Sequence, residues 1–305
     1  MQRSIERARS FWILAPALLL LALVFGLKAF FLVWGFFTLM GLGALLVLLL
    51  HNAVTSFWGR PLEPYLYPLA RLLPWLGVLG LVLFLDLPTL YPWARGGEDA
   101  LLAHRASYLN APFFLLRYAL FFVLFTLVLQ RLKPGETRAT VGAAGLPLTF
   151  AAGTFLVFDL FMALEAHFYS ASFGALMLLS AAVAALAYGA FRASRAPTPE
   201  LKAQLTSLTN LLLALSIIWI YVEATTLIII WGADLPHEAQ FYLKRTIYPW
   251  DLMAFGVAVG GFLLPFLALL TNLPKRDPRW LGGIALWVLA FRFLHYLWYV
   301  LPPLA

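Results

Sequence analysis

Side chains that can exchange protons occur inside, or at the ends of, long apolar stretches of this sequence. Asp159, Glu223 and His295 are each flanked by apolar residues on both sides. An ionisable group in such a stretch is usually paired, faces a wet cavity or takes part in proton transfer, because lipid solvates charge poorly. Four further groups of this kind stand near the ends of apolar stretches: His51, Glu165, His167 and Asp251. We treat all seven residues as candidates for proton transfer.

Two arginines, Arg117 and Arg292, also lie within apolar stretches and are candidates for ion pairs. A pair of Asp159 with either arginine would neutralise charge between helices and need serve no other purpose. The alternative is a polar pocket or proton relay that includes Asp159, Glu223 and His295. Helix rise places all five groups roughly 8–13 Å below the same membrane face, which favours the relay. We expect Asp159 to reach at least one arginine, and Glu223 to face a polar cavity.

The composition indicates which class of protein holds these groups. Of 305 residues, 63% are apolar and 11% are charged, with a mean hydropathy of +0.88. Soluble domains are about 45–50% apolar and about 25% charged, so a soluble, collagen-like, disordered or disulfide-rich chain is excluded. The chain has no cysteine, which excludes iron–sulfur clusters, c-type haem and cysteine-bound zinc within it. We predict an all-α integral membrane protein.

A hydrocarbon core of about 30 Å requires roughly 20 apolar residues per helix. Nine stretches meet this length and predict transmembrane helices: 11–27, 29–51, 67–87, 112–130, 142–164, 173–191, 205–231, 250–271 and 280–300. The first two stretches join through Gly26-Leu27-Lys28, which makes this the weakest division. The connections between consecutive helices are short, so neighbouring helices should run antiparallel. We predict a cytoplasmic tail (1–10), a peripheral helix (11–28) and two four-helix bundles (29–166 and 167–305).

The basic residues predict the orientation. Fourteen of the 21 lysines and arginines fall on the side of the N-terminus, five fall on the opposite side and two lie within spans. Because basic residues gather in cytoplasmic loops, the N-terminus is expected in the cytoplasm and the C-terminus in the periplasm. The net charge of +7 is explained by this topology, so no nucleic-acid partner is expected.

The histidines do not predict a haem site. Two histidines from different helices would have to face each other at one depth to hold a b-type haem. His51 and His295 lie at different depths, and His167 is at or beyond the end of its helix. We expect the chain itself to bind no cofactor and to be colourless.

Five sequence motifs resemble a known family, in matching order and at matching helix positions. The run from Tyr108 to Arg117 resembles the outer start of the fourth helix in a membrane subunit of alternative complex III, a bacterial quinol:electron-acceptor oxidoreductase. That subunit belongs to the polysulfide-reductase membrane-subunit family, and the similarity is greater to the second, smaller paralogue. The other similar segments are Leu87–Trp93, Asp159–His167, Trp219–Trp231 with Leu235–Glu238, and Arg292 with Trp298 and Pro302.

The resemblance implies a function and partners. It implies a multi-pass subunit of the bacterial inner membrane that supports oxidation of menaquinol or ubiquinol. The implied partners are a paralogous membrane subunit, a multihaem cytochrome c, an iron–sulfur protein and a monohaem cytochrome c, which hold the haems and clusters. The chain departs from the family pattern at Glu223, Thr226 and His295, where the family has a neutral residue, a glutamine and an acid.

Two alternatives remain open. The chain could be a purely structural membrane anchor of the same complex, with quinol held by the paralogue. It could also be a secondary transporter, a class in which glycine or proline breaks helices near the membrane midplane. The only such interruption of note is Gly260-Gly261 with Pro265, and no internal repeat is visible.

Overall fold

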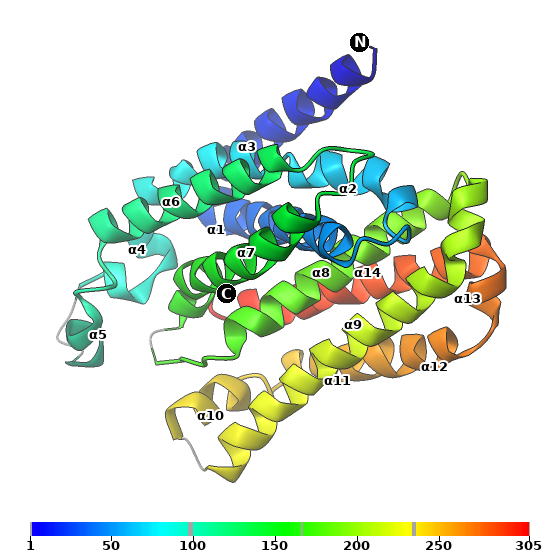
Figure 1. Ribbon diagram of the computed structural model, residues 1–305. Coiled ribbons are helices and arrows are strands. Elements are labelled where there is room, and N and C mark those ends of the chain that lie inside the picture. Colours follow the sequence, from blue (N-terminus) through cyan, green and yellow to red (C-terminus); the bar gives the residue numbers. More distant parts are fainter. Residues whose placement is uncertain (1, 97–99, 166, 234–235, 305) are drawn as a thin grey trace.

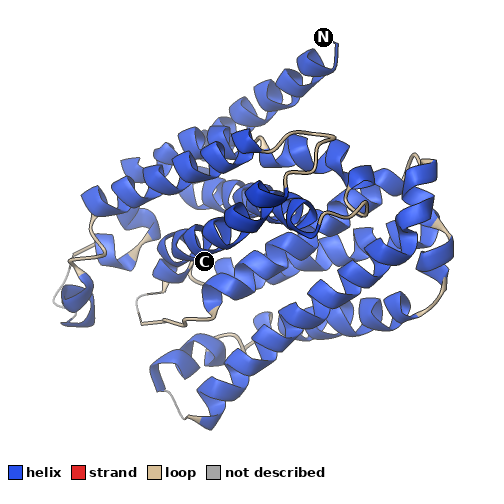
Figure 2. Cartoon of the chain, in the orientation of Figure 1, coloured by secondary structure: helices blue, strands red, loops and turns tan. Residues whose placement is uncertain are grey.

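The computed structural model describes the backbone of residues 2–96, 100–165, 167–233 and 236–304, and the side chains of 24–96, 102–165, 167–233 and 238–304. Within these ranges the chain contains helices and loops but no strand, and helices account for 82% of the chain (Figure 2). Eight helical segments among the described residues are long and apolar enough to span a membrane. The predictions of an all-α fold and of a multi-pass membrane protein are therefore confirmed.

The first half of the chain contains seven α-helices and four 3-10 turns. These are α1 (Gln2–Val54), η1 (Arg60–Leu62), α2 (Glu63–Ala70), α3 (Leu73–Leu79), η2 (Gly80–Leu85), α4 (Leu87–Leu90), η3 (Pro92–Ala94), α5 (Ala100–Arg105), α6 (Ala111–Arg131), α7 (Ala139–Leu160) and η4 (Met162–Leu164). The second half contains seven α-helices and one π-helix. These are α8 (Phe173–Ser194), α9 (Pro199–Gly232), α10 (Pro236–Leu243), α11 (Trp250–Ala258), the π-helix η5 (Val259–Leu263), α12 (Leu264–Leu270), α13 (Leu273–Arg276) and α14 (Pro278–Val300).

The eight membrane-spanning segments overlap the predicted stretches from 29–51 onward. They are Val24–Val54, Arg60–Leu85, Ala111–Arg131, Ala139–Leu164, Phe173–Ser194, Pro199–Gly232, Trp250–Leu270 and Pro278–Val300. The predicted first span, 11–27, lies mostly outside the residues whose side chains are described, so the count of nine stays a prediction. The backbone does break at the expected division, because Gly26 has a φ of 82° and a ψ of 174° inside α1.

Capping residues explain where several of these helices begin. Asn110, Thr198 and Asp277 precede α6, α9 and α14, and each side chain accepts a backbone N–H from the first turn. A proline stands in the first turn of all three helices, where its missing N–H leaves no bond unmade. The loops before these helices therefore end at defined residues, which fixes the register of the side chains along α6, α9 and α14.

Helix α8 lies in the middle of the molecule and packs against α14, α1, α9 and α7 (Figure 1). Small residues allow the closest approach: a Cβ on Gly43 of α1 would overlap the carbonyl of Ala181 in α8. Such small-residue contacts are typical of helix packing in membranes, where dispersion replaces the hydrophobic effect. Helix α8 thereby packs against helices from both halves of the chain.

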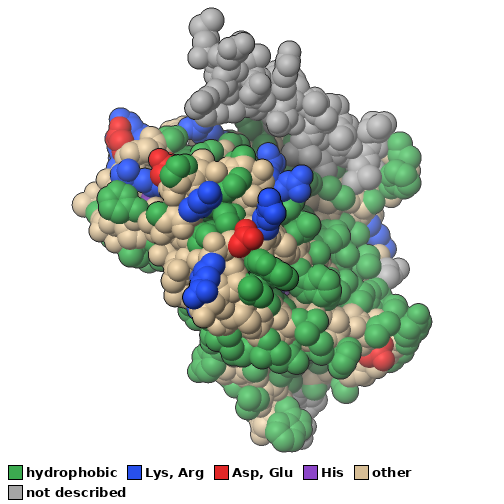
Figure 3. Space-filling view, turned by 90° about the vertical axis from the view of Figure 1, so that its right-hand side faces the viewer, with side chains coloured by type: hydrophobic (Ala, Val, Ile, Leu, Met, Phe, Trp, Pro, Cys, Tyr) green, Lys and Arg blue, Asp and Glu red, His purple; other side chains and the backbone are tan. Residues whose placement is uncertain are grey.

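The loops gather at two ends of the molecule. Loops 55–59, 132–138, 195–198 and 271–277 form one end, which we call the basic end; Figure 3 looks onto it and shows its lysine and arginine side chains. The described parts of the connecting segments 86–110, 161–172, 233–249 and 301–304 form the opposite end. Contacts between distant segments join the latter loops, for example Lys244 Nζ to Glu165 Oε2 at 3.1 Å.

Candidate functional site

A chain of hydrogen-bonded side chains connects the membrane-spanning helices α14, α9 and α8. Tyr299 donates its hydroxyl to Glu223 Oε1 at 2.6 Å, and Glu223 Oε2 lies 3.2 Å from His295 Nε2. On the other face of the imidazole, Nδ1 lies 3.0 Å from Ser180 Oγ. His295 and Tyr299 share one face of α14 because they are four residues apart. Four polar groups from three helices therefore form one continuous path.

This arrangement can move a proton in either direction. When His295 Nε2 carries the proton it donates to Glu223, and Nδ1 then accepts from the Ser180 hydroxyl. A proton that reaches Glu223 can pass to Nε2, while a proton on Nδ1 leaves toward Ser180. His295 is 1% exposed, and the Glu223 side chain is 12% exposed. The path is therefore shielded from lipid along most of its length.

Arg292 lies one turn before His295 and is held without a carboxylate partner. Its Nη2 donates to the Gly261 carbonyl at 2.6 Å, and its guanidinium carbon lies 3.4 Å from the centroid of the Trp219 ring. The π-helix at Val259–Leu263 frees backbone carbonyls from the usual helical pattern, and Gly261 lies within it. Arg292 is one of the two candidates for an ion pair, but within the described part of the chain a carbonyl and a ring take the carboxylate's place.

A small cavity borders the same residues. Its volume is about 10 Å³, and Ser180, Arg292, His295 and Tyr296 are among its lining residues. Two guanidinium nitrogens of Arg292, Nε and Nη1, have no hydrogen-bond partner among the residues that the structure describes. Glu223 is not among the residues that line this cavity. The expectation that Glu223 faces a polar cavity is therefore not met there, because His295 stands between the carboxylate and the space.

Asp159 forms a separate site with Arg117. Arg117 donates from Nε and Nη2 to the two carboxylate oxygens, at 2.8 and 3.0 Å. Its third nitrogen, Nη1, donates to the Tyr108 carbonyl at 2.9 Å, and the Tyr108 and Phe113 rings cover the guanidinium at 3.8 and 4.4 Å. The predicted contact between Asp159 and an arginine is thus confirmed.

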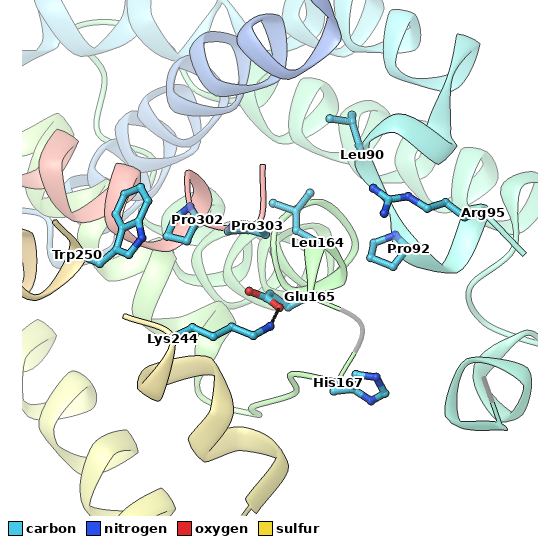
Figure 4. Close-up of a pocket in the computed structure, with 10 residues that line it drawn as sticks. All are labelled: Leu90, Pro92, Arg95, Leu164, Glu165, His167, Lys244, Trp250, Pro302 and Pro303. Carbon is cyan, nitrogen blue, oxygen red and sulfur yellow. Dashed lines mark hydrogen bonds and ion pairs between the residues drawn. The ribbon is translucent and has the colours of Figure 1, made fainter. Parts of the chain in front are cut away.

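Glu165 and His167 belong to a cavity at the opposite end. Its volume is about 360 Å³, and loops from both halves of the chain line it (Figure 4). Glu165 Oε2 lies 3.1 Å from Lys244 Nζ, and its Oε1 lies 3.7 Å from Arg245 Nη1. Arg245 also donates to the carbonyls of Phe241, Trp298 and Tyr299. Burial lowers the pKa of this guanidinium to about 10.

The other two predicted residues lie apart from these groups. His51 Nε2 is 3.6 Å from Glu63 Oε1, and both side chains are buried toward the basic end. Asp251 is exposed at the start of α11, where its carboxylate accepts the N–H of Leu252. The structure therefore joins Glu223 with His295, and Glu165 borders the same cavity as His167. Asp159, His51 and Asp251 stand in three other places.

Four residues that contact the predicted site residues were not predicted from the sequence. Tyr299 could have been found, because it stands four residues after His295 on the same helix face. Ser180 and Glu63 carry no sequence signal that separates them from other polar residues near helix ends. Arg245 lies between the predicted spans 205–231 and 250–271, but it is 1% exposed. Its burial depends on carbonyls from α10 and α14, which sequence spacing does not reveal.

Comparison with known proteins adds no evidence about this site. No protein-family model matches the chain, and no curated protein sequence matches it. No group of three or more metal-ligating His, Cys, Asp or Glu side chains occurs within the part of the chain that the structure describes.

Proposed function

We propose that this chain is an integral membrane subunit of a quinol:electron-acceptor oxidoreductase, and that Glu223 and His295 transfer protons in it. The observation that carries the proposal is the hydrogen-bonded path Tyr299–Glu223–His295–Ser180 inside the membrane-spanning region. Oxidation of a quinol to a quinone releases two electrons and two protons, so such a subunit needs proton acceptors. The five motifs that resemble alternative complex III support the assignment to this reaction.

In this proposal the chain holds no redox group and works within an assembly. Electrons pass to haems and iron–sulfur clusters of the partner subunits, which are the paralogous membrane subunit, the two cytochromes and the iron–sulfur protein. The chain contributes the membrane path for protons. The basic end faces the cytoplasm of a bacterial cell, as the distribution of lysine and arginine favours. The grouping of the spans into two four-helix bundles, 29–166 and 167–305, belongs to the same proposal.

The transporter alternative has weaker support from the geometry. The expected interruption is present as the π-helix, with Gly260 and Gly261 at its centre. Its carbonyls are taken up by α14, because Trp287 donates to Gly260 at 2.8 Å and Arg292 donates to Gly261. In transporters, unwound backbone of this kind coordinates the transported ion. Here these two carbonyls are already occupied by side chains.

The test begins with purification of the tagged chain from its own cells. We expect c-type haem subunits to co-purify and the preparation to reduce cytochrome c with quinol. Purification without haem proteins and without quinol oxidation would contradict the assignment to this complex.

The same preparation tests the proton path. Glu223→Gln keeps the shape of the side chain but removes the titratable group, so quinol oxidation should fall. Glu200→Gln, an exposed acid on the same helix, is the matched control and should retain activity. Full activity of Glu223→Gln in an intact complex would make the chain a structural anchor.

A further inference from the structure

An apolar groove lies on the lipid-facing surface of the protein between α12 and α14, next to the basic end. Its volume is about 260 Å³, and its lining includes Leu264, Pro265, Ala268, Trp280, Gly283 and Trp287. All of its lining side chains are apolar. Leu264, Trp280 and Trp287 remain 48%, 53% and 47% exposed, so the groove is open on the lipid side.

Glycine and a fixed tryptophan shape this groove. A Cβ placed on Gly283 would meet no atom within 4 Å, so the floor of the groove is open space. The indole of Trp287 is held by its hydrogen bond to the Gly260 carbonyl, which the π-helix exposes. The groove is therefore built into the packing of α12 against α14.

Positive charge gathers where the groove meets the basic end. Lys275, Arg276 and Arg279 occur within five residues, and Arg276 and Arg279 are exposed. Neither arginine forms an ion pair with any residue in the described ranges. The neighbouring acid, Asp277, accepts the backbone N–H of Arg279 at 2.8 Å and caps α14. Arg279 shares a helix face with Gly283, four residues later, so it stands at the mouth of the groove.

The dimensions favour a lipid chain over a protein helix. From Trp280 to Trp287 the groove follows only about 10 Å of the α14 axis. A partner helix crossing the membrane would require contact over about 30 Å. Charged pockets on the basic side of membrane helices attract anionic head groups, and Trp280 stands at the level where tryptophan meets the head groups.

We infer that this groove binds one anionic phospholipid, with an acyl chain between Trp280 and Trp287 and its phosphate at Arg276 and Arg279. The inference is independent of the proposed redox function, because it uses none of the residues in the proton path. The bound lipid would cover the open face of the α12–α14 pair and supply the anion that the two arginines lack.

The test uses the full chain in detergent and native mass spectrometry. Dioleoylphosphatidylglycerol is titrated against dioleoylphosphatidylcholine, which has the same acyl chains without net charge. We expect one tightly retained phosphatidylglycerol. Because each basic residue near a membrane surface contributes about 1 kcal/mol, Arg276→Gln/Arg279→Gln should weaken its binding about 30-fold. Arg131→Gln/Arg195→Gln removes the same charge from exposed sites on the same end and should leave binding unchanged.

A second variant tests the groove itself. Gly283→Leu adds a side chain at a position where a Cβ would meet no atom within 4 Å, and should displace the acyl chain. Gly232→Leu adds the same side chain at another open glycine, outside the groove, and is the control. Equal retention of the two lipids would overturn the site. So would unchanged phosphatidylglycerol binding in Arg276→Gln/Arg279→Gln or in Gly283→Leu. A dimer that disappears with Gly283→Leu would assign the groove to a second copy and also overturn it.

Discussion

Two carboxylates within the membrane-spanning helices, one in each half of the chain, are held in different ways. Asp159 is 2% exposed, and both of its oxygens accept from one guanidinium, that of Arg117. Glu223 accepts from the Tyr299 hydroxyl and faces the imidazole of His295. Arginine cannot give up its proton under ordinary conditions, whereas imidazole and carboxyl groups can exchange theirs. The first site fixes a charge, and the second can pass one on.

The difference shows that depth in the membrane does not by itself identify a functional acid. The sequence places Asp159 and Glu223 in the same half of the bilayer, but only the partners distinguish their roles. A bidentate pair gives both charges a permanent counter-charge and defined geometry. A path of hydroxyl, carboxyl and imidazole keeps its hydrogen bonds when the protons shift along it. Four experiments can break or sharpen this comparison.

The largest effect is expected from Asp159→Asn. This variant leaves the Arg117 guanidinium buried without its counter-charge, and breaking a buried pair in this way lowers the free energy of unfolding by about 3–5 kcal/mol. Thermal unfolding in detergent measures it. Glu136→Gln removes a carboxylate that is 55% exposed, beside Arg138, and should change stability by less than about 1 kcal/mol.

The double variant Asp159→Asn/Arg117→Gln tests the cause of that loss. It removes both charges, so part of the stability should return. If the double variant lost as much stability as the two single variants together, Asp159 and Arg117 would not act as a pair. Asp159 would then not be the fixed charge with which Glu223 is compared.

Glu223→Gln should give the opposite pattern, with a large effect on activity and a small effect on stability. The glutamine oxygen can still accept from Tyr299, and its amide can donate to His295 Nε2 once the imidazole proton moves to Nδ1. Quinol oxidation should nevertheless fall about 100-fold, as is usual when a proton-transfer group is lost. Thermal unfolding and steady-state quinol:cytochrome c assays on one preparation separate the two effects. A loss of stability as large as that of Asp159→Asn would make Glu223 structural.

Sequence reasoning accounted for much of the fold because lipid imposes it. Long apolar stretches predicted the eight membrane-spanning segments of the described residues, and the break at Gly26 fell at the predicted division. It also predicted that Asp159 reaches an arginine, since an unpaired charge there is too unfavourable. It could not choose between Arg117 and Arg292, because that choice depends on helix rotation. The Gly261 carbonyl is free to accept from Arg292 because Pro265, four residues later, has no N–H to donate to it.

Ser180→Ala tests the far end of the proton path. The hydroxyl makes one neutral hydrogen bond to His295 Nδ1, and such a bond contributes about 1 kcal/mol, or about a fivefold change in rate. Ser172→Ala removes a hydroxyl at the residue before the same helix, where it bonds Thr226 at 2.7 Å outside the path. We expect only Ser180→Ala to slow quinol oxidation. An equal loss in both variants would mean that the path ends at His295.

The smallest effect concerns pH and the Asp159 site. Burial, reinforced by the charge of Asp159, raises the pKa of the Tyr108 phenol from 10.0 to about 12. Because the folded chain holds this proton more tightly than the unfolded chain, the contribution to stability is complete below about pH 10 and is lost as the pH rises through about 12. Tyr108→Phe removes the titrating group, so its melting temperature should fall less than that of the wild type over this alkaline range. Tyr221→Phe, at an exposed tyrosine, should follow the wild type. The effect is small because Tyr108 is only partly buried. Parallel curves for Tyr108→Phe and the wild type would show that neither burial nor the Asp159 carboxylate raises the pKa of this phenol.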